Sequence, residues 1–532
     1  MNSKLNLMKT RNLYIVLISL IVALGGFLLG FDSAVISGAV PFYRSVFGLE
    51  NGSLLLGLSV SAIIFGAMGG NFIGGILADI FGRKIVLILT AVLFTFCALA
   101  TALTDNLTFF IFARIIGGLG VGMSILVAPM YIAEIAPREK RGTLVSINQL
   151  NIVIGISTAY FTNYFILQNV TDPDLNWRWM LGIGAIPAVL YFFLLYFIPQ
   201  SPRWLVLKKR DDEAKKTLRS LGGEEYAEKV FNEIKESISN TSETKGIGFS
   251  EVFTRKMTLI LIIGLGIAFF QQITGINAIF YYAPMIFGMA GGGQNAAFAQ
   301  AIILGLTNVA FTIVAMFLID RLGRKPLLII GSIGIMISLS MAGLAFRMAN
   351  YTLTEKSLTT VMQAAQDSET GNEESGILLR NGLESMLNKP FDNEIAFFKE
   401  VRQQIGSENY NEFKSVILEN AITMKARMVL VGLILYVASF AISLGPVMWA
   451  LLSEIFPNRM RGVMISIVGT WNSVVSFGVA TVFPKELEVI GSGMTFLIFA
   501  FLGLLTLLFV LRYVPETKGK SLEELENMLV RE

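Results

Sequence analysis

The chain has 532 residues, of which 54% are hydrophobic and 15% are charged, and its formal net charge is +3. This composition excludes a water-soluble globular protein, in which about a quarter of the residues are charged, and the small net charge gives no indication of nucleic acid as a partner. The chain is therefore predicted to be a polytopic membrane protein in contact with the lipid bilayer.

Twelve apolar runs are long enough to cross a bilayer, which takes about 20 residues each. Each is expected to be a helix, because backbone amides in lipid must be hydrogen-bonded within their own segment. Six runs precede a polar gap and six follow it, near residues 13–40, 53–78, 85–104, 107–136, 143–167, 178–199, 257–287, 297–319, 327–347, 427–456, 463–484 and 493–514. The predicted fold class is an all-α membrane protein with twelve transmembrane helices.

The short loops between the runs alternate in charge. Those after runs 2, 4, 8 and 10 contain ten Lys and Arg residues, whereas the short loops on the other side contain three. Because positively charged loops stay in the cytoplasm, both termini are expected to be cytoplasmic. The first run has no small-residue cleavage site and should be an uncleaved anchor. A multi-pass protein of a bacterial inner (plasma) membrane is the predicted location.

The first run contains one carboxylate, Asp32, with no charged neighbour between Leu24 and Gly38. A charge at bilayer depth costs about 2.5 to 3.5 kcal/mol on insertion scales, so it needs a partner, a cavity or a role in proton transfer. Arg114, inside the fourth run, needs an anion, and Asp32 is the intramembrane candidate. The chain has no His, so proton chemistry must fall to carboxylates.

Two charged motifs recur after equivalent runs and divide the chain into two related halves. Asp79 recurs as Asp320 at an offset of 241 residues, and Glu134 recurs as Glu454 at an offset of 320 residues. Such motifs could form ion pairs that close the cytoplasmic side, or could serve topology alone. The predicted gate residues are Asp79, Arg83, Glu134, Arg141, Asp320, Arg324, Glu454 and Arg461.

The two offsets differ by 79 residues, which locates an insertion at 348–424, on the outer side. Its helical periodicity at 393–402 and 411–419 predicts a small helical cap. The sequence is compatible with three roles for this insertion: a tolerated surface insertion, a site of partner binding, or control of access to the carrier. The predicted domains are a six-helix half at 1–200, a cytoplasmic linker of short amphipathic helices at 201–256, a second six-helix half at 257–514 interrupted by 348–424, and a cytoplasmic tail at 515–532.

Uncharged polar and aromatic residues cluster by repeat within the runs. An offset of 241 carries Asp32 to a position beside Gln271 and Gln272, and an offset of 320 carries Gln149 to a position beside Trp471. Amides both donate and accept hydrogen bonds, and indoles stack on sugar rings, so the set suits a neutral polyhydroxylated ligand. The alternative is that these residues only tie helices together. The set derived from the repeat is Gln149, Gln271, Gln272, Asn277, Tyr281, Trp449 and Trp471.

Other chemistries find little support in the sequence. The Gly-rich run from Arg114 to Gly122 follows no strand, so its glycines are expected to allow close helix packing instead of binding a nucleotide. With no His and the single Cys97, the chain is predicted to have no metal and no internal disulfide. No nucleophile, base and acid converge, so an enzyme is not expected.

Seven motifs in order closely resemble the sugar porter family of the major facilitator superfamily, and most of all the bacterial D-xylose/proton symporters. They are Gly75 to Lys84, Pro129 to Gly142, Pro199 to Leu205, Gln271 to Tyr282, Asp320 to Lys325, Gly445 to Gly462 and Pro515 to Gly519. The resemblance implies two six-helix halves around a central sugar site and adds Asn308 to the residues that line it. It also implies that Asp32, near Arg114, is the protonation site.

Three departures from the family pattern affect what the resemblance implies. Gln200 stands where the family usually has Glu, Thr470 replaces a Gln of xylose symporters, and the insertion at 348–424 is unusual. The expected function is proton-coupled uptake of a monosaccharide, D-xylose or a related sugar, with the proton as coupling ion and no other cofactor. A sugar uniporter, a proton/myo-inositol symporter and a non-transporting sugar receptor are the alternatives.

Overall fold

The structure is a computed structural model that describes residues 2–49, 52–137, 140–242, 253–291, 293–366, 373–457, 460–520 and 522–529. The first six predicted runs form one bundle, the N-half. Its helices are α1 (Asn2–Val46), α2 (Leu54–Phe81), α3 (Arg83–Leu103), α4 (Leu107–Ile135), α5 (Arg141–Asn169), α6 (Pro173–Gly182) and α7 (Ala185–Leu195).

The second bundle, the C-half, contains α12 (Thr258–Ile273), α13 (Ile276–Met289), α14 (Gly293–Leu322), α15 (Arg324–Arg347), α19 (Ala426–Ile442), α20 (Leu444–Ile455) and α21 (Arg461–Tyr513). Eleven helical segments among the described residues are long and apolar enough to span a membrane. The last of them, α21, has 53 residues and bends at Gly491, where φ is 80°. It therefore covers the two predicted runs at 463–484 and 493–514.

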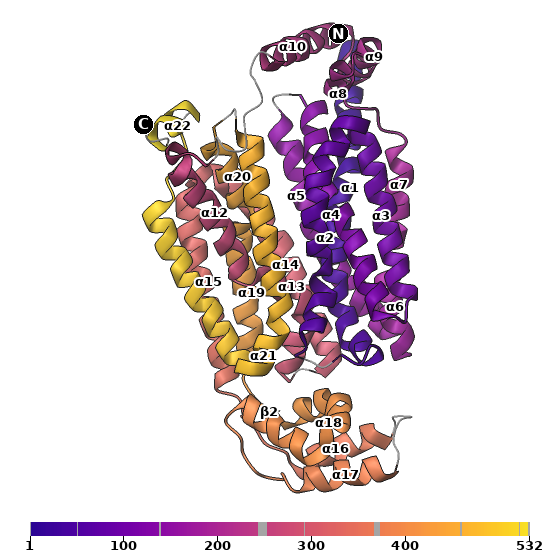
Figure 1. The fold of residues 1–532 in the computed structure, drawn as a ribbon, viewed down its shortest axis with the longest axis vertical. Helices are drawn as coiled ribbons and strands as arrows, with labels where there is room; N and C mark the ends of the chain where they lie inside the picture. The colour runs from indigo at the N-terminus through magenta and orange to yellow at the C-terminus, as the bar shows by residue number, and fades with distance from the viewer. Residues whose placement is uncertain are drawn as a thin grey trace.

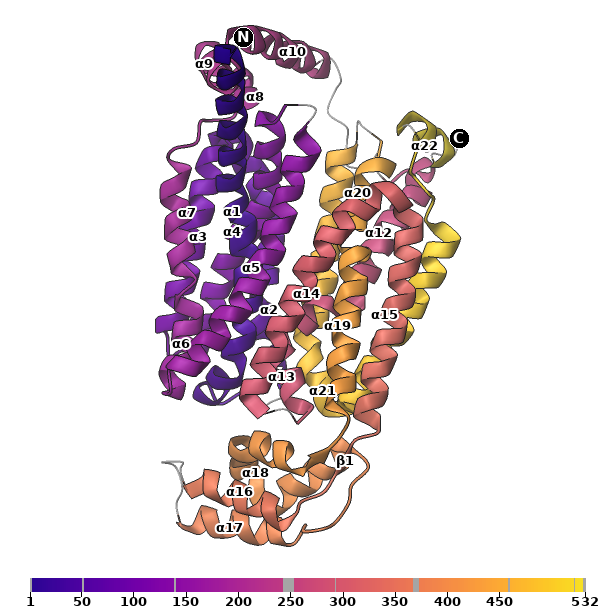
Figure 2. The same cartoon turned by 180° about the vertical axis from the view of Figure 1, so that it is seen from behind.

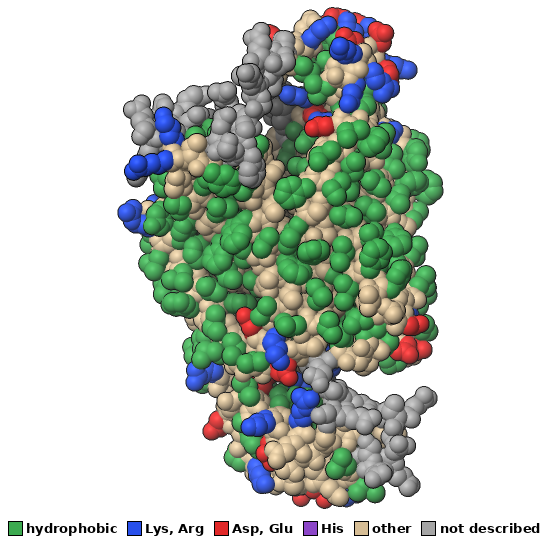
Figure 3. All heavy atoms as spheres, in the orientation of Figure 1, with side chains coloured by type: hydrophobic (Ala, Val, Ile, Leu, Met, Phe, Trp, Pro, Cys, Tyr) green, Lys and Arg blue, Asp and Glu red, His purple; other side chains and the backbone are tan. Residues whose placement is uncertain are grey.

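Hydrophobic side chains cover the outer face of both bundles, and charged side chains gather at the two ends (Figure 3). Inside the N-half, α2 and α4 pack closely because of glycines in α4. A Cβ on Gly118 would lie 2.2 Å from the carbonyl oxygen of Ile63, and one on Gly122 would lie 2.2 Å from that of Ala67. The packing role predicted for the Gly-rich run is confirmed.

The two bundles meet at one end and diverge toward the end that carries both termini (Figures 1 and 2). Side-chain hydrogen bonds join the halves near the end where the bundles meet. They include Ser61 to Thr481 (2.6 Å), Tyr160 to the carbonyl oxygen of Phe280 (2.8 Å) and Gln168 to Asn295 (2.9 Å). The conformation is closed at this end.

Short amphipathic helices follow the N-half, as predicted for the linker. They are α8 (Pro202–Leu207), α9 (Asp211–Gly222), α10 (Glu224–Ser242) and a 3-10 turn at Arg255–Met257. Trp204, Leu218 and Phe231 are buried in a small core of their own. These helices and α22 (Leu522–Leu529) lie at the end with the termini (Figure 1). Residues 243–252 of the predicted linker lie outside the described residues.

The insertion forms a separate helical cap at the opposite end, below both bundles in Figures 1 and 2. It contains α16 (Glu355–Gln366), α17 (Glu373–Glu384) and α18 (Glu394–Ala421), and the antiparallel pair β1 (Asn350–Tyr351) and β2 (Ile422–Thr423) closes its base. Helix α18 bends at Gly406, where φ is 78°, and covers both segments predicted to be helical. The helical prediction is confirmed.

The cap has its own core and is attached to the C-half. Phe397, Val401 and Ile405 of α18 are fully buried in that core. At the junction, the Glu394 carboxylate accepts a hydrogen bond from the backbone N–H of Ser492 in α21 (3.2 Å). The ammonium group of Lys414 lies 4.4 Å from the centre of the Phe398 ring. Two ionisable side chains are thus held where the cap meets the bundle.

The stability of the cap should depend on pH through these two side chains. Desolvation raises the pKa of Glu394 above its usual 4.5, although the hydrogen bonds from Ser492 and the charge of Lys414 partly oppose this shift. Desolvation also lowers the pKa of Lys414 to about 8. The folded cap therefore holds the Glu394 proton longer than the unfolded chain does, and it releases the Lys414 proton earlier. Cap stability should fall as pH rises from 4.5 through the raised pKa of Glu394, and should increase between about 8 and 10.5.

Protease resistance of the cap, measured against pH, checks this expectation. Glu394→Gln should abolish the loss of cap stability as pH rises through the acidic range, and Lys414→Met should abolish the increase in cap stability at alkaline pH. The charges of Arg44, Arg402 and Glu488 also act on Lys414, and its ammonium group lies 5.3 Å from the centre of the Tyr410 ring. These residues are unchanged in both variants. Glu384→Gln on α17, where Glu384 pairs with Arg380 in the same helix, is the matched control. A Glu394→Gln profile that follows the wild type would contradict the assignment.

Candidate functional site

Asp32 of α1 and Arg114 of α4 form an ion pair inside the N-half. The Nη1 atom of Arg114 lies 2.9 Å from Oδ2 of Asp32, and the side chains are 1% and 16% exposed, respectively. Arg114 also donates to the carbonyl oxygen of Val60 (3.4 Å). The arginine is therefore enclosed, while the carboxylate is partly exposed.

The other half approaches this pair through α13. Tyr281 is 4% exposed and reaches Ser33, the residue that follows Asp32. Tyr281 of the C-half is thus a neighbour of the Asp32–Arg114 pair across the interface.

The polar groups of the C-half form a network of amides around α12. The Gln271 side chain donates through Nε2 to the carbonyl oxygen of Leu444 (2.8 Å). Its Oε1 accepts from Gln272 (3.2 Å) and from Asn472 (2.8 Å). Oε1 of Gln272 accepts from Asn277 (2.9 Å). These contacts assemble the two glutamines and the asparagine that the sequence placed together.

Two helix breaks make this network possible. Between α12 and α13, Gly275 has φ of 90°, and its own position is tight because a Cβ there would lie 2.4 Å from the Phe499 ring. The break brings Asn277 back toward Gln272. Between α19 and α20, Ser443 is non-helical, with φ of −125° and ψ of −100°. Leu444 is the first residue of α20 after this break, and its carbonyl oxygen accepts the Gln271 bond.

In the described part of the chain, the remaining predicted residues make no side-chain hydrogen bond to this network. Gln149 of α5 is half-buried, and Asn308 of α14 is 5% exposed. Trp449 and Trp471 are 38% and 39% exposed, and Trp471 stacks on Phe269 with centroids 6.4 Å apart. Trp471 also lines a cavity of about 560 Å³ between α12 and α21, together with Leu265, Gly266, Phe269, Ile467, Thr470 and Val474.

Asn472 and Ser476 belong to the network, although sequence reasoning did not select them. Asn472 is 8% exposed and contacts both glutamines, and the Ser476 hydroxyl accepts from Asn277 (2.7 Å). The two lie four residues apart and so share one face of α21. Polar residues at that spacing within an apolar run were the signal that could have found them.

The predicted gate residues pair within each half. In the N-half, Arg83 contacts Asp79 (3.3 Å) and Glu134 (3.0 Å). In the C-half, the equivalent contacts of Arg324 are with Asp320 (3.3 Å) and Glu454 (2.8 Å). Arg461 donates to the carbonyl oxygen of Phe456 (3.3 Å), and the side chain of Arg141 lies outside the described residues. The pairs therefore hold each half together at the end where the bundles are apart.

Gln200, the departure from the family pattern, has a clear counterpart in the other half. Its Oε1 accepts from the backbone N–H of Lys84 (3.1 Å). At the equivalent place, the Glu516 carboxylate accepts from the N–H groups of Arg324 (3.1 Å) and Lys325 (3.0 Å). The amide keeps the backbone contact and loses the negative charge.

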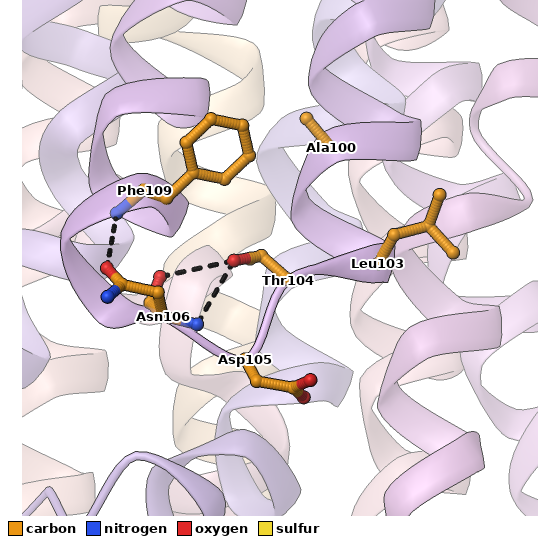
Figure 4. Close-up of a pocket in the computed structure, with 6 residues that line it drawn as sticks. All are labelled: Ala100, Leu103, Thr104, Asp105, Asn106 and Phe109. Carbon is orange, nitrogen blue, oxygen red and sulfur yellow. Dashed lines mark hydrogen bonds between the residues drawn. The ribbon is translucent and has the colours of Figure 1, made fainter.

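A second hollow, of about 550 Å³, lies at the turn between α3 and α4 (Figure 4). The Asn106 side chain there caps α4 by accepting from the N–H of Phe109 (3.0 Å), and the Thr104 hydroxyl accepts from the N–H of Asn106 (3.1 Å). These bonds define a helix start and are not directed at a ligand. Among the described residues, no three His, Cys, Asp or Glu side chains gather as a metal site would require.

The known proteins that this chain resembles are sugar transporters. The family model described as "Sugar (and other) transporter" matches residues 18–365 and 414–529, so it omits part of the cap. The arabinose-proton symporter of Bacillus subtilis is 35% identical over 523 residues, covering 97% of this chain and 96% of that protein. The D-xylose-proton symporter of Escherichia coli is 33% identical over 549 residues, covering 96% and 95%.

The fold agrees with a solved structure as well. The inward-open conformation of the xylose transporter from Escherichia coli has a TM-score of 0.70 with this chain at 32% identity, covering 97% of this chain and 100% of that one. The two-bundle arrangement with twelve membrane crossings is therefore shared with that transporter.

Proposed function

This chain belongs to the sugar transporter family of membrane carriers, and on that premise we propose that it is a proton-coupled symporter that moves a monosaccharide into the cell. Binding would occur between the halves, and transport would proceed by alternating access. D-xylose or a related pentose or hexose is the proposed substrate, and Asp32 is the proposed proton site. The membrane is the bacterial inner membrane, with both termini in the cytoplasm.

One observation carries the proposal: the carboxylate of Asp32, held by Arg114 at 2.9 Å in one half, lies beside Tyr281 of the other half, whose bundle contains an uncharged amide network. Amides suit a neutral ligand with many hydroxyls. Protonation of Asp32 removes its charge and weakens the bond to Arg114, because hydrogen bonds between ionised groups are roughly twice as strong as neutral ones. Proton binding and sugar binding thus act on adjoining surfaces of the same interface.

The proposed orientation in the membrane makes this conformation an inward-facing state. With cytoplasmic termini, the end where the bundles diverge faces the cytoplasm and the cap lies outside. The hydrogen bonds of Ser61, Tyr160 and Gln168 between the halves then close the outer side. Arg83 and Arg324 bind acids within their own halves in this state, and an outward-facing state would bring these groups together across the interface.

A proton/myo-inositol symporter is the second candidate, because the chain is also 34% identical over 550 residues to a protein named probable inositol transporter 2 of Arabidopsis thaliana. The amide network by itself does not distinguish a sugar from a cyclic polyol, since both present neutral hydroxyls on a ring. Thr470 does not distinguish them either, because its hydroxyl donates to the Ser466 carbonyl oxygen of its own helix (2.9 Å).

Sugar-driven proton movement in proteoliposomes tests the proposal. Adding the substrate outside vesicles that contain the purified protein should make the medium more alkaline, because each sugar enters with a proton. D-xylose, L-arabinose, D-glucose and myo-inositol are added in turn, and a protonophore should abolish the signal. Uptake of labelled sugar without a pH change would indicate a uniporter, and binding without uptake would indicate a receptor.

A further inference from the structure

Asn472 occupies the centre of the amide network. Through Nδ2 it donates to Oε1 of Gln271 (2.8 Å) and to the carbonyl oxygen of Ala268 (3.0 Å), and its Oδ1 accepts from Nε2 of Gln272 (3.0 Å). Its side chain is therefore bonded on both sides and is 8% exposed. In the described part of the chain, it is the one side chain bonded to both glutamine amides.

The orientation of each glutamine amide matters, because a half-turn of an amide exchanges a donor for an acceptor. Gln271 is oriented by the Leu444 carbonyl oxygen, which takes its N–H group and turns Oε1 toward Asn472. Gln272 is oriented by Asn277, which donates to Oε1 and leaves Nε2 to Asn472. Asn472 provides a donor to one glutamine and an acceptor to the other, which an apolar side chain cannot do.

A bound sugar has to enter this network. The bond between Gln272 Nε2 and Gln271 Oε1, at 3.2 Å, is the longest of those that join one amide side chain to another. A ligand hydroxyl can take that N–H of Gln272 while Asn472 continues to hold Gln271. Without Asn472, both amides would be free to turn, and the ligand would have to order them on binding, which lowers affinity.

We propose that Asn472 is a positioning residue of the sugar site, which fixes the orientation of the Gln271 and Gln272 amides and thereby sets the affinity for the sugar. The inference rests on the proposed function, since it assigns a role within that same site. A residue that only ties α21 to α12 would affect the stability of the C-half and leave sugar affinity unchanged.

Two substitutions test the role. Asn472→Leu keeps the branched shape of the side chain and removes both hydrogen-bonding groups. Asn472→Asp keeps the shape and size but faces Oε1 of Gln271 with a second oxygen. Both should raise the Kd of the sugar that the wild type transports at least tenfold, and raise KM similarly, with the maximum uptake rate within twofold. Ser473→Ala is the matched control, because the Ser473 hydroxyl bonds to the Gly469 carbonyl oxygen in its own helix (3.1 Å).

The measurements are isothermal titration of the purified full-length protein, uptake in proteoliposomes, and the melting temperature without sugar. An unchanged Kd in folded Asn472→Leu and Asn472→Asp would overturn the inference, and if Asn472→Leu does not fold, Asn472→Asp decides alone. A wild type that binds none of the four test compounds counts against the proposed function. A wild type that transports sugar, with a defective Gln271→Ala variant and normal Asn472 variants, counts against the role of Asn472 alone.

Discussion

Replacing Asp32 by Asn should abolish uphill accumulation of sugar and leave sugar exchange across the membrane intact. Asn keeps the size of the side chain and can still accept a hydrogen bond from Arg114, now 2.9 Å from the carboxylate. It cannot take up or release a proton at any relevant pH. The variant behaves as if the proton were permanently bound, so the loaded carrier should still change conformation.

The size of the effect follows from the energy of the proton gradient. Each proton that crosses with the sugar contributes about 2.3 kcal/mol per 100 mV of membrane potential, which supports an accumulation of about 50-fold. Asp32→Asn should reduce this ratio to about one. The measurement is the steady-state ratio of labelled sugar inside and outside proteoliposomes under an imposed gradient, alongside counterflow exchange without a gradient.

Asp105→Asn serves as the control. Asp105 also pairs with an arginine, Arg178, but its side chain is 81% exposed at the turn between α3 and α4. Its replacement should leave accumulation and exchange unchanged. If Asp32→Asn still accumulates sugar to the wild-type ratio, Asp32 is not the coupling site, and the ion pair with Arg114 is permanent.

Replacing Gln271 by Ala should have the largest effect on sugar binding, raising the Kd by about 10- to 100-fold. The substitution leaves the Leu444 carbonyl oxygen and the Asn472 and Gln272 amides without their shared partner. A buried polar group that loses its partner costs about 1 to 3 kcal/mol. Since Gln271 also links α12 to the break between α19 and α20, the melting temperature should fall as well.

Titration of sugar into the purified variant gives the Kd, and a thermal scan gives the stability. Gln271→Glu provides a second variant that keeps the length of the side chain but turns a carboxylate oxygen toward the Leu444 carbonyl oxygen. Gln363→Ala, on the exposed face of α16 in the cap, is the control. If the Gln271→Ala protein binds sugar with wild-type affinity, the amide network is not part of the binding site.

The sequence alone predicted most of the architecture. Apolar runs and recurring charged motifs located the spans, the two halves and the insertion, because the cost of placing polar groups in lipid acts on each segment by itself. The same cost required a partner for Asp32, and Arg114 is that neighbour in the structure. The helical periodicity of the insertion was sufficient to predict the two parts of α18.

The tertiary structure decided the details of the site. Gln271 and Asn277 would lie on different faces of a straight helix. Gly275 and Pro284 in the sequence already favour a break there, and the structure shows which amides the break at Gly275 brings into contact. Asn472 has no counterpart in the motifs of the repeat, and its importance depends on which face of α21 meets α12. Contacts between helices far apart in sequence determine that face, and no local property of the chain encodes it.

The sequence by itself determined the class of the protein, its division into halves, its family and the need for a buried ion pair, because these follow from composition, segment length and the cost of desolvating charge. Only the tertiary structure decided that the bundles meet at the end with the cap and diverge at the other, and that Asn472 joins the two glutamines. Those features depend on the relative placement of whole helices, which results from packing over the entire chain.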